Sequence, residues 1–272
     1  MSETDATLHD RLRELGLSQT DVQRRVVQIN ERQEMNERTA RLFSPVLKLL
    51  GGITILGYDE AFADKNGSAI IASHHRTWLD VPTLGLAFEQ GASAAGRTPR
   101  YPRFVAKDNL NLSIFGRYFD RRGAIFVHRG HELEGQAAEA EIDEALEDGE
   151  DVVIFPTGTR KHGDDFDEKK LKKTICTIAM KGGTPIMPVW VDNTKVMEGR
   201  SLVVFRPLVQ VERFDTGSVE HDPERPSPSQ EELDIVKALN SEARKLRTRI
   251  YDEMMAGKAI AKEHKKRRIT TP

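Results

Sequence analysis

Residues 69–80, AIIASHHRTWLD, contain the unit from which the fold can be built. The run from Ala69 to Ser73 is short, apolar and rich in isoleucine, which is typical of a buried strand. Thr77 to Asp80 fits a capping box, and Pro82 suits a first helical turn. The stretch therefore predicts a strand, then a turn that carries His75, then a helix that begins near Asp80.

Similar β-rich runs recur along the chain and alternate with helical stretches. They lie at Ile53 to Tyr58, Ala69 to Ser73, Arg103 to Lys107, Ala124 to His128, Asp151 to Phe155, Ile186 to Val191 and Leu202 to Phe205. One of the intervening helices is expected from about Glu132 to Glu147. Alternation of this kind indicates layers of helix on sheet. We therefore expect an α/β fold, with a layered mixed β-sheet flanked by helices and helical additions at both ends.

The chain divides into four predicted segments. Residues 1–52 form a helical N-terminal segment, and residues 53–214 form the main α/β domain. Residues 215–229 contain three prolines and are expected to be a linker. Residues 230–272 form a C-terminal helix, expected from about Gln230 to Lys262, followed by a basic tail.

Two terminal stretches each have two interpretations. In the first, Phe43, Val46, Leu47 and Leu50 recur at helical spacing, so this face either covers the core or lies against a membrane surface. In the second, Lys258 to Arg268 holds six basic residues against one glutamate. This tail is either a solvated, disordered end or a contact with an anionic membrane.

Composition narrows the class of protein and its compartment. A net charge of −2 over 272 residues gives no bias toward nucleic acid, so no nucleic-acid partner is expected. The single cysteine, Cys176, excludes an internal disulfide, and no secretory signal opens the chain, so we expect a cytoplasmic protein. The apolar tract from Leu42 to Leu56 is broken by Lys48 and two glycines, and falls short of the roughly 20 residues that cross a bilayer.

His75 and Asp80 are the first candidate catalytic residues. On a continuous helix, positions five apart point about 140° away from each other, so the two can meet only across a turn. If they meet, the carboxylate fixes the imidazole tautomer and the ring can take a proton from a substrate hydroxyl. The spacing alone is a weak signal. Asp80 as a mere capping acid and His75 as a structural histidine remain alternatives.

Metal binding is not expected. His74, His75, His128 and His131 could be ligands, but no cysteine lies nearby and no His-Glu-x-x-His spacing occurs. We expect His74 to be structural, or to contact the site residues without touching the substrate.

Two further stretches carry chemistry that suits a phosphate group. Residues 121–129 read RRGAIFVHR, where Gly123 permits a close backbone approach and Arg129 emerges at the end of an apolar strand. Residues 155–160 read FPTGTR and form a small turn that ends in Arg160. Hydroxyls and amides in such a turn can donate to a phosphate or an oxyanion. An ordinary surface arginine is the alternative for Arg129.

Taken in this order and spacing, these stretches resemble the glycerolipid acyltransferase family, which includes the 1-acylglycerol-3-phosphate acyltransferases. The first family block, a histidine and an aspartate separated by four residues, is similar to His75 and Asp80. The second, Gly-x-x-Phe-x-x-Arg, is matched by Gly123, Phe126 and Arg129. The resemblance covers roughly residues 53–214 and implies the glycerol-3-phosphate acyltransferase-like fold.

The third block departs from the family at one position. The family usually has Phe-Pro-Glu-Gly-Thr-Arg, and this chain has Thr157 where the glutamate would be. The change removes a negative charge and leaves the identity of the acceptor open. The fourth block, a proline ahead of an apolar strand, is matched by Pro185 or Pro188.

The resemblance implies a role for each matched residue. His75 would be the base and Asp80 the residue that orients it. Residues that would bind the acceptor phosphate are Arg129, Arg160, Gly123, Gly158 and Thr159. Thr157 and Phe126 would set acceptor specificity.

The resemblance also implies the reaction. A fatty acyl group would pass from acyl-CoA or acyl-ACP to a lysophospholipid hydroxyl, first of all that of 1-acylglycerol-3-phosphate, in phospholipid synthesis. No metal or other cofactor is implied, and the enzyme would be peripheral on the inner face of the cell membrane. The alternatives are another acceptor, such as a glycolipid, an amino-acid lipid or glycerol phosphate, and a non-catalytic lipid-binding relative.

Overall fold

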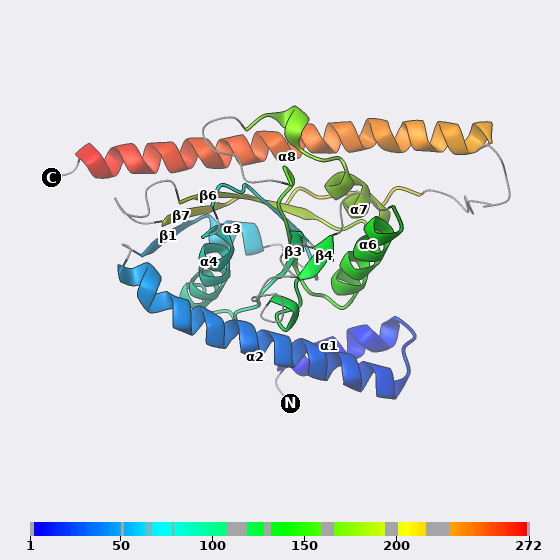
Figure 1. The fold of residues 1–272 in the computed structure, drawn as a ribbon, viewed down its shortest axis with the longest axis horizontal. Coiled ribbons are helices and arrows are strands. Elements are labelled where there is room, and N and C mark those ends of the chain that lie inside the picture. Colours follow the sequence, from blue (N-terminus) through cyan, green and yellow to red (C-terminus); the bar gives the residue numbers. More distant parts are fainter. Residues whose placement is uncertain are drawn as a thin grey trace.

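A computed structural model of the protein describes residues 3–49, 52–63, 65, 67–77, 79–107, 119–127, 132–158, 166–193, 201–215 and 229–270. A twisted sheet runs through the middle of the molecule, with helices on both of its faces and long helices at both ends of the chain (Figure 1).

The sheet has seven strands in the described residues, in the order β1-β7-β6-β2-β5-β3-β4. Their bounds are β1 Ile53–Leu56, β2 Ile70–Ser73, β3 Arg103–Lys107, β4 Ile125–Val127, β5 Val152–Ile154, β6 Ile186–Asp192 and β7 Ser201–Phe205. The strands β6, β2, β5, β3 and β4 are parallel to one another, whereas β7 is antiparallel to β6 and parallel to β1. The sheet is therefore mixed, and the predicted fold class is confirmed.

The strand directions define two edges. The five parallel strands end at one edge, here called the carboxyl edge, and begin at the opposite, amino edge. Because β7 is antiparallel to β6, its first residues pair with the last residues of β6, as Leu202 does with Asp192. Ile53 of β1 in turn pairs with Ser201. Both β7 and β1 therefore begin at the carboxyl edge.

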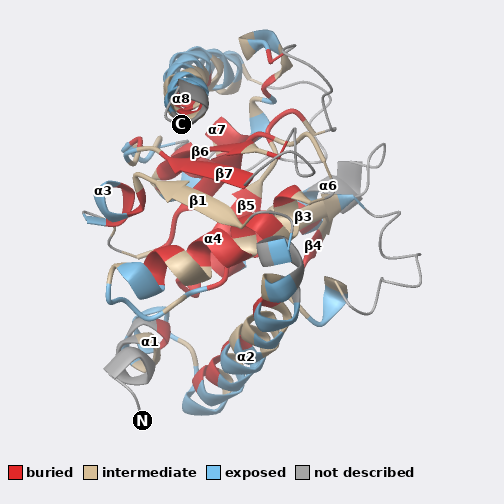
Figure 2. Cartoon of the chain, turned by 90° about the vertical axis from the view of Figure 1, so that its left-hand side faces the viewer, coloured by how far each residue is buried: buried red, intermediate tan, exposed pale blue. Residues whose placement is uncertain are grey.

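Alternate strand residues pack into two apolar layers, one on each face of the sheet. Figure 2 shows the central strands as buried, with helices on either side of the sheet. Ile70 and Ala72 face a layer shared with α6 (Glu132–Glu147), α7 (Thr174–Gly182) and α8 (Gln230–Thr270). Ile71 faces the other layer, with α3 (Tyr58–Ala63) and α4 (Asp80–Ala94). Burial on both faces explains why the strands read as continuous apolar runs.

The terminal helices differ in part from the expectation. The helix α2 (Gln19–Leu49) packs on α4 and joins the predicted charged helix and the apolar tract into one element, with α1 (Glu3–Glu14) beside it. A short 3-10 helix, Glu168–Lys170, contacts α8. The helix α8 continues to Thr270, so the basic stretch is helical and the predicted end near Lys262 is wrong. Most of the predicted linker, residues 216–228, lies outside the described residues.

Partly buried ion pairs hold α2 against the amino edge. Arg25 lies 2.6 Å from Asp148, and Arg32 lies 2.6 Å from Glu150, whose side chain is almost fully buried. Both carboxylates belong to the turn that precedes β5. From there α2 crosses the molecule and ends next to the start of β1, at the carboxyl edge.

Gly123 lies at the amino edge, two residues before β4. Its φ is 70°, and its carbonyl accepts a hydrogen bond from Arg103 Nε at 2.7 Å. A Cβ added here would come within 2.6 Å of Arg32 Cδ. Both the backbone conformation and the close contact with α2 therefore favour glycine.

We predict that Gly123→Ala lowers the free energy of unfolding by about 1–3 kcal/mol, because the side chain is strained at positive φ and displaces Arg32. Urea denaturation measures the change. Gly85→Ala is the matched control, since it lies within α4 and an added Cβ there meets no atom within 4 Å. It should be neutral or stabilising, by up to about 1 kcal/mol. Equal effects of the two substitutions would contradict the prediction.

An aromatic stack joins α8 to the end of β2. The ring of His74 is buried and stacks on Trp190 with centroids 4.3 Å apart, and Phe166 meets it edge-on at 5.1 Å. From α8, Tyr251 stacks on Phe166 and the ammonium of Lys258 lies 5.6 Å from the Trp190 ring centroid. Neither ring nitrogen of His74 has a hydrogen-bond partner among the described residues. Burial, with Arg76 nearby, lowers the pKa of His74 to about 4.

This lowered pKa makes stability depend on pH. Between pH 6.5 and about 4 the unfolded chain binds a proton at His74 that the folded protein does not, so folding is weakened as the pH falls. The loss approaches roughly 3 kcal/mol at the acid end. His74→Phe keeps the stack without a titrating nitrogen, so its denaturation midpoint should fall less than that of wild type between pH 7.5 and 5. Parallel curves for the two proteins would refute this account.

Candidate active site

His75 and Asp80 meet across the turn between β2 and α4, at the carboxyl edge. His75 follows Ser73, the last residue of β2, by two positions, and Asp80 is the first residue of α4. His75 Nδ1 lies 2.9 Å from Asp80 Oδ2. Thr77 helps to close the turn, because its hydroxyl accepts a hydrogen bond from the backbone N–H of Leu79. The geometry required for a His–Asp pair is present, and its catalytic role stays a prediction.

The Asp80 carboxylate is buried and fully engaged. Oδ2 accepts hydrogen bonds from the backbone N–H groups of Arg76 at 2.6 Å and Thr77 at 2.8 Å, in addition to that of His75. Oδ1 accepts from the Thr77 hydroxyl at 3.1 Å and from Asn193 Nδ2 at 2.9 Å. Burial alone would raise the pKa of Asp80, but these hydrogen bonds outweigh it and hold the pKa below its usual value. Asp80 is therefore a stable anion.

The imidazole is held on its other side by an aromatic ring. Phe155 follows β5 and stacks on His75 with centroids 4.1 Å apart. The His75 side chain keeps 15% of its surface exposed, whereas Asp80 keeps 1%. Because a carboxylate only accepts hydrogen bonds, Nδ1 carries the hydrogen, and Nε2 is the nitrogen that can take a proton from a substrate.

The third sequence block lies beside this pair. After Phe155, the chain turns back so that the Gly158 N–H donates to the Phe155 carbonyl at 2.8 Å, with a φ of 66° at Gly158. Thr157 is buried within this turn. The turn follows β5, which neighbours β2 at the carboxyl edge, so the first and third blocks come together. Thr159 and Arg160 lie outside the described residues.

The described residues of the second block lie away from the His75–Asp80 pair. Gly123 lies at the amino edge, against Arg103 and Arg32, and therefore away from His75. Its predicted contact with the acceptor phosphate is not supported, because the length of β4 separates it from the carboxyl edge. Phe126 lies within β4, an outer strand that β3 and β5 separate from β2. Arg129 lies outside the described residues.

Asn193 belongs to the site and was missed in the sequence. It follows β6 by one residue and reaches Asp80 from the neighbouring strand. A lone asparagine after a strand matches no motif. The signal that could have found it is topological, since β6 pairs with β2 in parallel and both strands end at the same edge.

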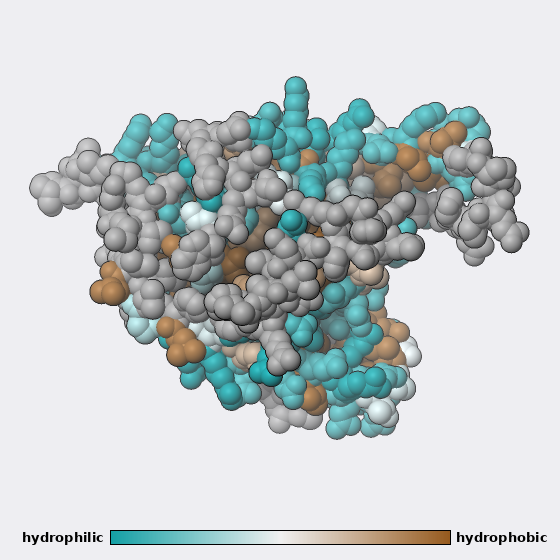
Figure 3. Space-filling model, in the orientation of Figure 1, coloured by the Kyte–Doolittle hydropathy of each residue, from teal (hydrophilic) through white to brown (hydrophobic). Residues whose placement is uncertain are grey.

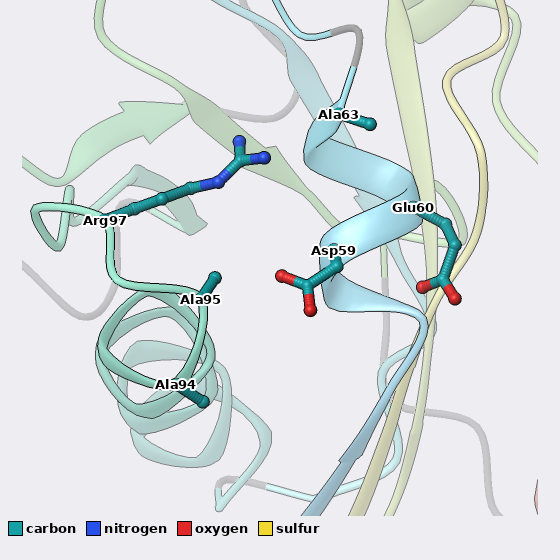
Figure 4. A pocket seen from close by; sticks show the side chains of 6 residues that line it. All are labelled: Asp59, Glu60, Ala63, Ala94, Ala95 and Arg97. Atoms are coloured by element: carbon teal, nitrogen blue, oxygen red, sulfur yellow. The ribbon is translucent and has the colours of Figure 1, made fainter.

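An open hollow elsewhere on the molecule is not this site. It is lined by Asp59, Glu60, Ala63, Ala94, Ala95 and Arg97. Figure 4 shows Asp59 and Arg97 pointing into the space between α3 and the end of α4. The 15 residues of α4 place this hollow roughly 22 Å from Asp80 along the helix, at the amino edge.

No group of three or more His, Cys, Asp or Glu side chains is arranged to hold a metal ion within the described ranges. Within those ranges, too, every helix is too short or too polar to span a membrane.

Comparisons with known proteins place the chain in a family. The family model described as Acyltransferase matches residues 54–192, just over half of the chain. The 1-acyl-sn-glycerol-3-phosphate acyltransferase of Saccharomyces cerevisiae is 28% identical over 169 residues, 61% of this chain and 52% of the yeast protein. The Bacillus subtilis protein of the same name is 31% identical over 150 residues, 55% of this chain and 67% of that protein.

The chain thus spans about half of the yeast relative and two thirds of the bacterial one. A solved structure of the 1-acyl-sn-glycerophosphate (LPA) acyltransferase PlsC from Thermotoga maritima aligns with 87% of this chain and 86% of its own, at 18% identity and a TM-score of 0.44. The match of the family model across the sheet, from β1 to the end of β6, shows that the chain belongs to the acyltransferase family.

Proposed function

We propose that the chain transfers a fatty acyl group from an acyl thioester to a hydroxyl of a lysophospholipid, first of all 1-acylglycerol-3-phosphate. The observation that carries the proposal is the 2.9 Å contact between His75 Nδ1 and Asp80 Oδ2 beside the turn of residues 155–158. The names of the yeast and B. subtilis relatives support the choice of acceptor.

The proposed reaction uses His75 as a general base. Nε2 takes the proton of the acceptor hydroxyl as its oxygen attacks the thioester carbonyl, and the carbonyl becomes a tetrahedral oxyanion. Collapse of this intermediate breaks the carbon–sulfur bond, and the imidazolium returns the proton to the leaving thiolate. Asp80, ionised and buried, keeps the hydrogen on Nδ1 and stabilises the imidazolium. The steps require no metal or prosthetic group.

Recognition of the acceptor is assigned to the second and third blocks. Arg129 and Arg160 would bind its phosphate, since a guanidinium can donate two hydrogen bonds to phosphate oxygens. Gly158 and Thr159 would add backbone and hydroxyl donors, and Thr157 and Phe126 would tune specificity. Acyl-CoA and acyl-ACP are both suitable donors, because each presents a thioester with a good leaving group.

Two alternatives to this function are another acceptor and a protein that binds lipid without catalysis. Thr157 removes the acidic group that the family usually carries there, which favours testing a glycolipid, an amino-acid lipid and glycerol phosphate as acceptors. A non-catalytic lipid-binding relative is less well supported, because such a protein would have no need of an engaged, ionised Asp80 against His75.

We also propose that the protein works as a peripheral enzyme on the cytoplasmic, inner face of the cell membrane. In support, Leu42 and Leu49 near the end of α2 are 76% and 88% exposed. Figure 3 shows apolar groups standing out from this end of a mostly hydrophilic helix. The basic end of α8 lies at the same edge, because Lys265 Nζ contacts Asp192 at 2.8 Å. Each basic residue near an anionic surface adds about 1 kcal/mol to binding.

For catalysis, we expect His75→Ala and Asp80→Asn to lower kcat about 10³-fold or more, because each removes one member of the proton-transfer pair. Release of free thiol from palmitoyl-CoA, with a panel of phosphorylated and uncharged lysolipids, measures the rate and identifies the acceptor. His9→Ala, on α1, is the control and should keep the wild-type rate. Wild-type protein that releases no thiol with any acceptor would favour the binding protein.

For the membrane, we expect Leu42→Glu and Leu49→Glu to weaken binding to vesicles that contain anionic phospholipid, about tenfold together, because a charge replaces an exposed apolar group. Co-sedimentation measures the bound fraction. Val27→Glu is the matched control on the same helix, since Val27 is 50% exposed but lies toward the amino edge. Equal losses for both variants would argue against a docking role of this end of α2.

A further inference from the structure

Asn193 gives the Asp80 carboxylate its long-range hydrogen bond. The contacts from His75, Arg76 and Thr77 all come from within five residues of Asp80, inside the same turn. Asn193 is 113 residues away in sequence and enters from the end of β6. It is almost fully buried. The turn fixes the carboxylate relative to itself, whereas Asn193 fixes it relative to the sheet.

The side-chain amide of Asn193 is hydrogen-bonded to both Asp80 and Thr83. One N–H donates to Asp80 Oδ1 at 2.9 Å and the other to Thr83 Oγ1 at 3.2 Å. The Asn193 carbonyl oxygen lies 3.5 Å from the same hydroxyl. Thr83 is fully buried on the first turn of α4, so it holds the amide in the orientation that Asp80 needs. An aspartate at position 193 would offer no N–H and would set a second anion against the first.

The position of Asn193 is itself fixed from the opposite face of the sheet. The preceding residue, Asp192, pairs with Lys265 of α8 at 2.8 Å. Two residues further back, Trp190 packs against Gly257 and stacks on His74, the neighbour of His75. The end of β6 is therefore held between α8 and the catalytic turn, and its register determines where the amide lies.

We propose that Asn193 is a positioning residue that orients His75 through Asp80. Asn193 binds Oδ1 while His75 and the amides of the turn bind Oδ2, and together these contacts fix the plane of the carboxylate. This plane sets the direction in which the His75 ring presents Nε2. The proposal rests on the proposed function, because orientation of the ring matters only if Nε2 moves a proton. Asn193 itself need not touch either substrate.

Kinetics of Asn193→Ala and Asn193→Asp in the full chain test the role, with palmitoyl-CoA and the best acceptor of the panel. Asn193→Ala should lower kcat about 10- to 100-fold and leave both KM values within about twofold. Asn193→Asp should lower kcat further and move the acid limb of the kcat/KM profile to higher pH, because a second carboxylate stabilises the protonated imidazole. Asn240→Ala and Asn240→Asp, on α8, are the matched controls and should change neither.

The outcomes are separable. Inactive wild-type protein refutes the proposed function. Active wild type with an unchanged kcat and acid limb in both Asn193 variants overturns the positioning role, even if the variants are less stable. A raised acceptor KM at unchanged kcat also overturns it, since Asn193 would then bind substrate. If neither variant folds, Thr83→Val decides: a kcat about 3- to 10-fold lower at unchanged KM supports the role, and wild-type kcat refutes it.

Discussion

The site depends on the burial of one charge. The Asp80 carboxylate lies at the start of α4 with almost no exposure to water, a situation that costs several kcal/mol unless the charge is compensated. Five hydrogen bonds from a turn and a neighbouring strand supply the compensation. The same bonds define the path of the chain from β2 into α4, so the fold of this turn and the position of the imidazole have a single cause.

Much of the fold was predictable because its strands are buried on both faces. Such strands read as continuous apolar runs, and all seven were expected within two residues of their observed ends. The pairing of His75 with Asp80 was also predictable, since a strand, a turn and a helix start within twelve residues leave little freedom. Helix α6 has the predicted bounds, Glu132–Glu147. Its apolar positions recur on one face, so the sequence pattern alone was enough to predict it.

Other features depend on contacts between distant segments, which a local pattern does not encode. Gly123 was assigned to the site because it matches the family motif. In the structure, Arg32 of α2 lies against Gly123 at the amino edge, and this close contact requires a glycine. Asn193 has no motif, and its contact with Asp80 follows only from the pairing of β6 with β2. The basic end of α8 was expected to leave the helix, yet Lys265 is held by Asp192, so the helix continues.

The reversed direction of β7 has a consequence for the whole molecule. Had β7 and β1 followed the other five strands, the chain leaving α2 would have entered the sheet at the edge farthest from the turn that holds His75 and Asp80. Because they run the opposite way, the end of α2, the last turns of α8 and the His75 imidazole all lie at the carboxyl edge. The protein is thereby polarised: in our proposal one end meets the lipid substrate, while ion pairs at the other end hold α2 in place.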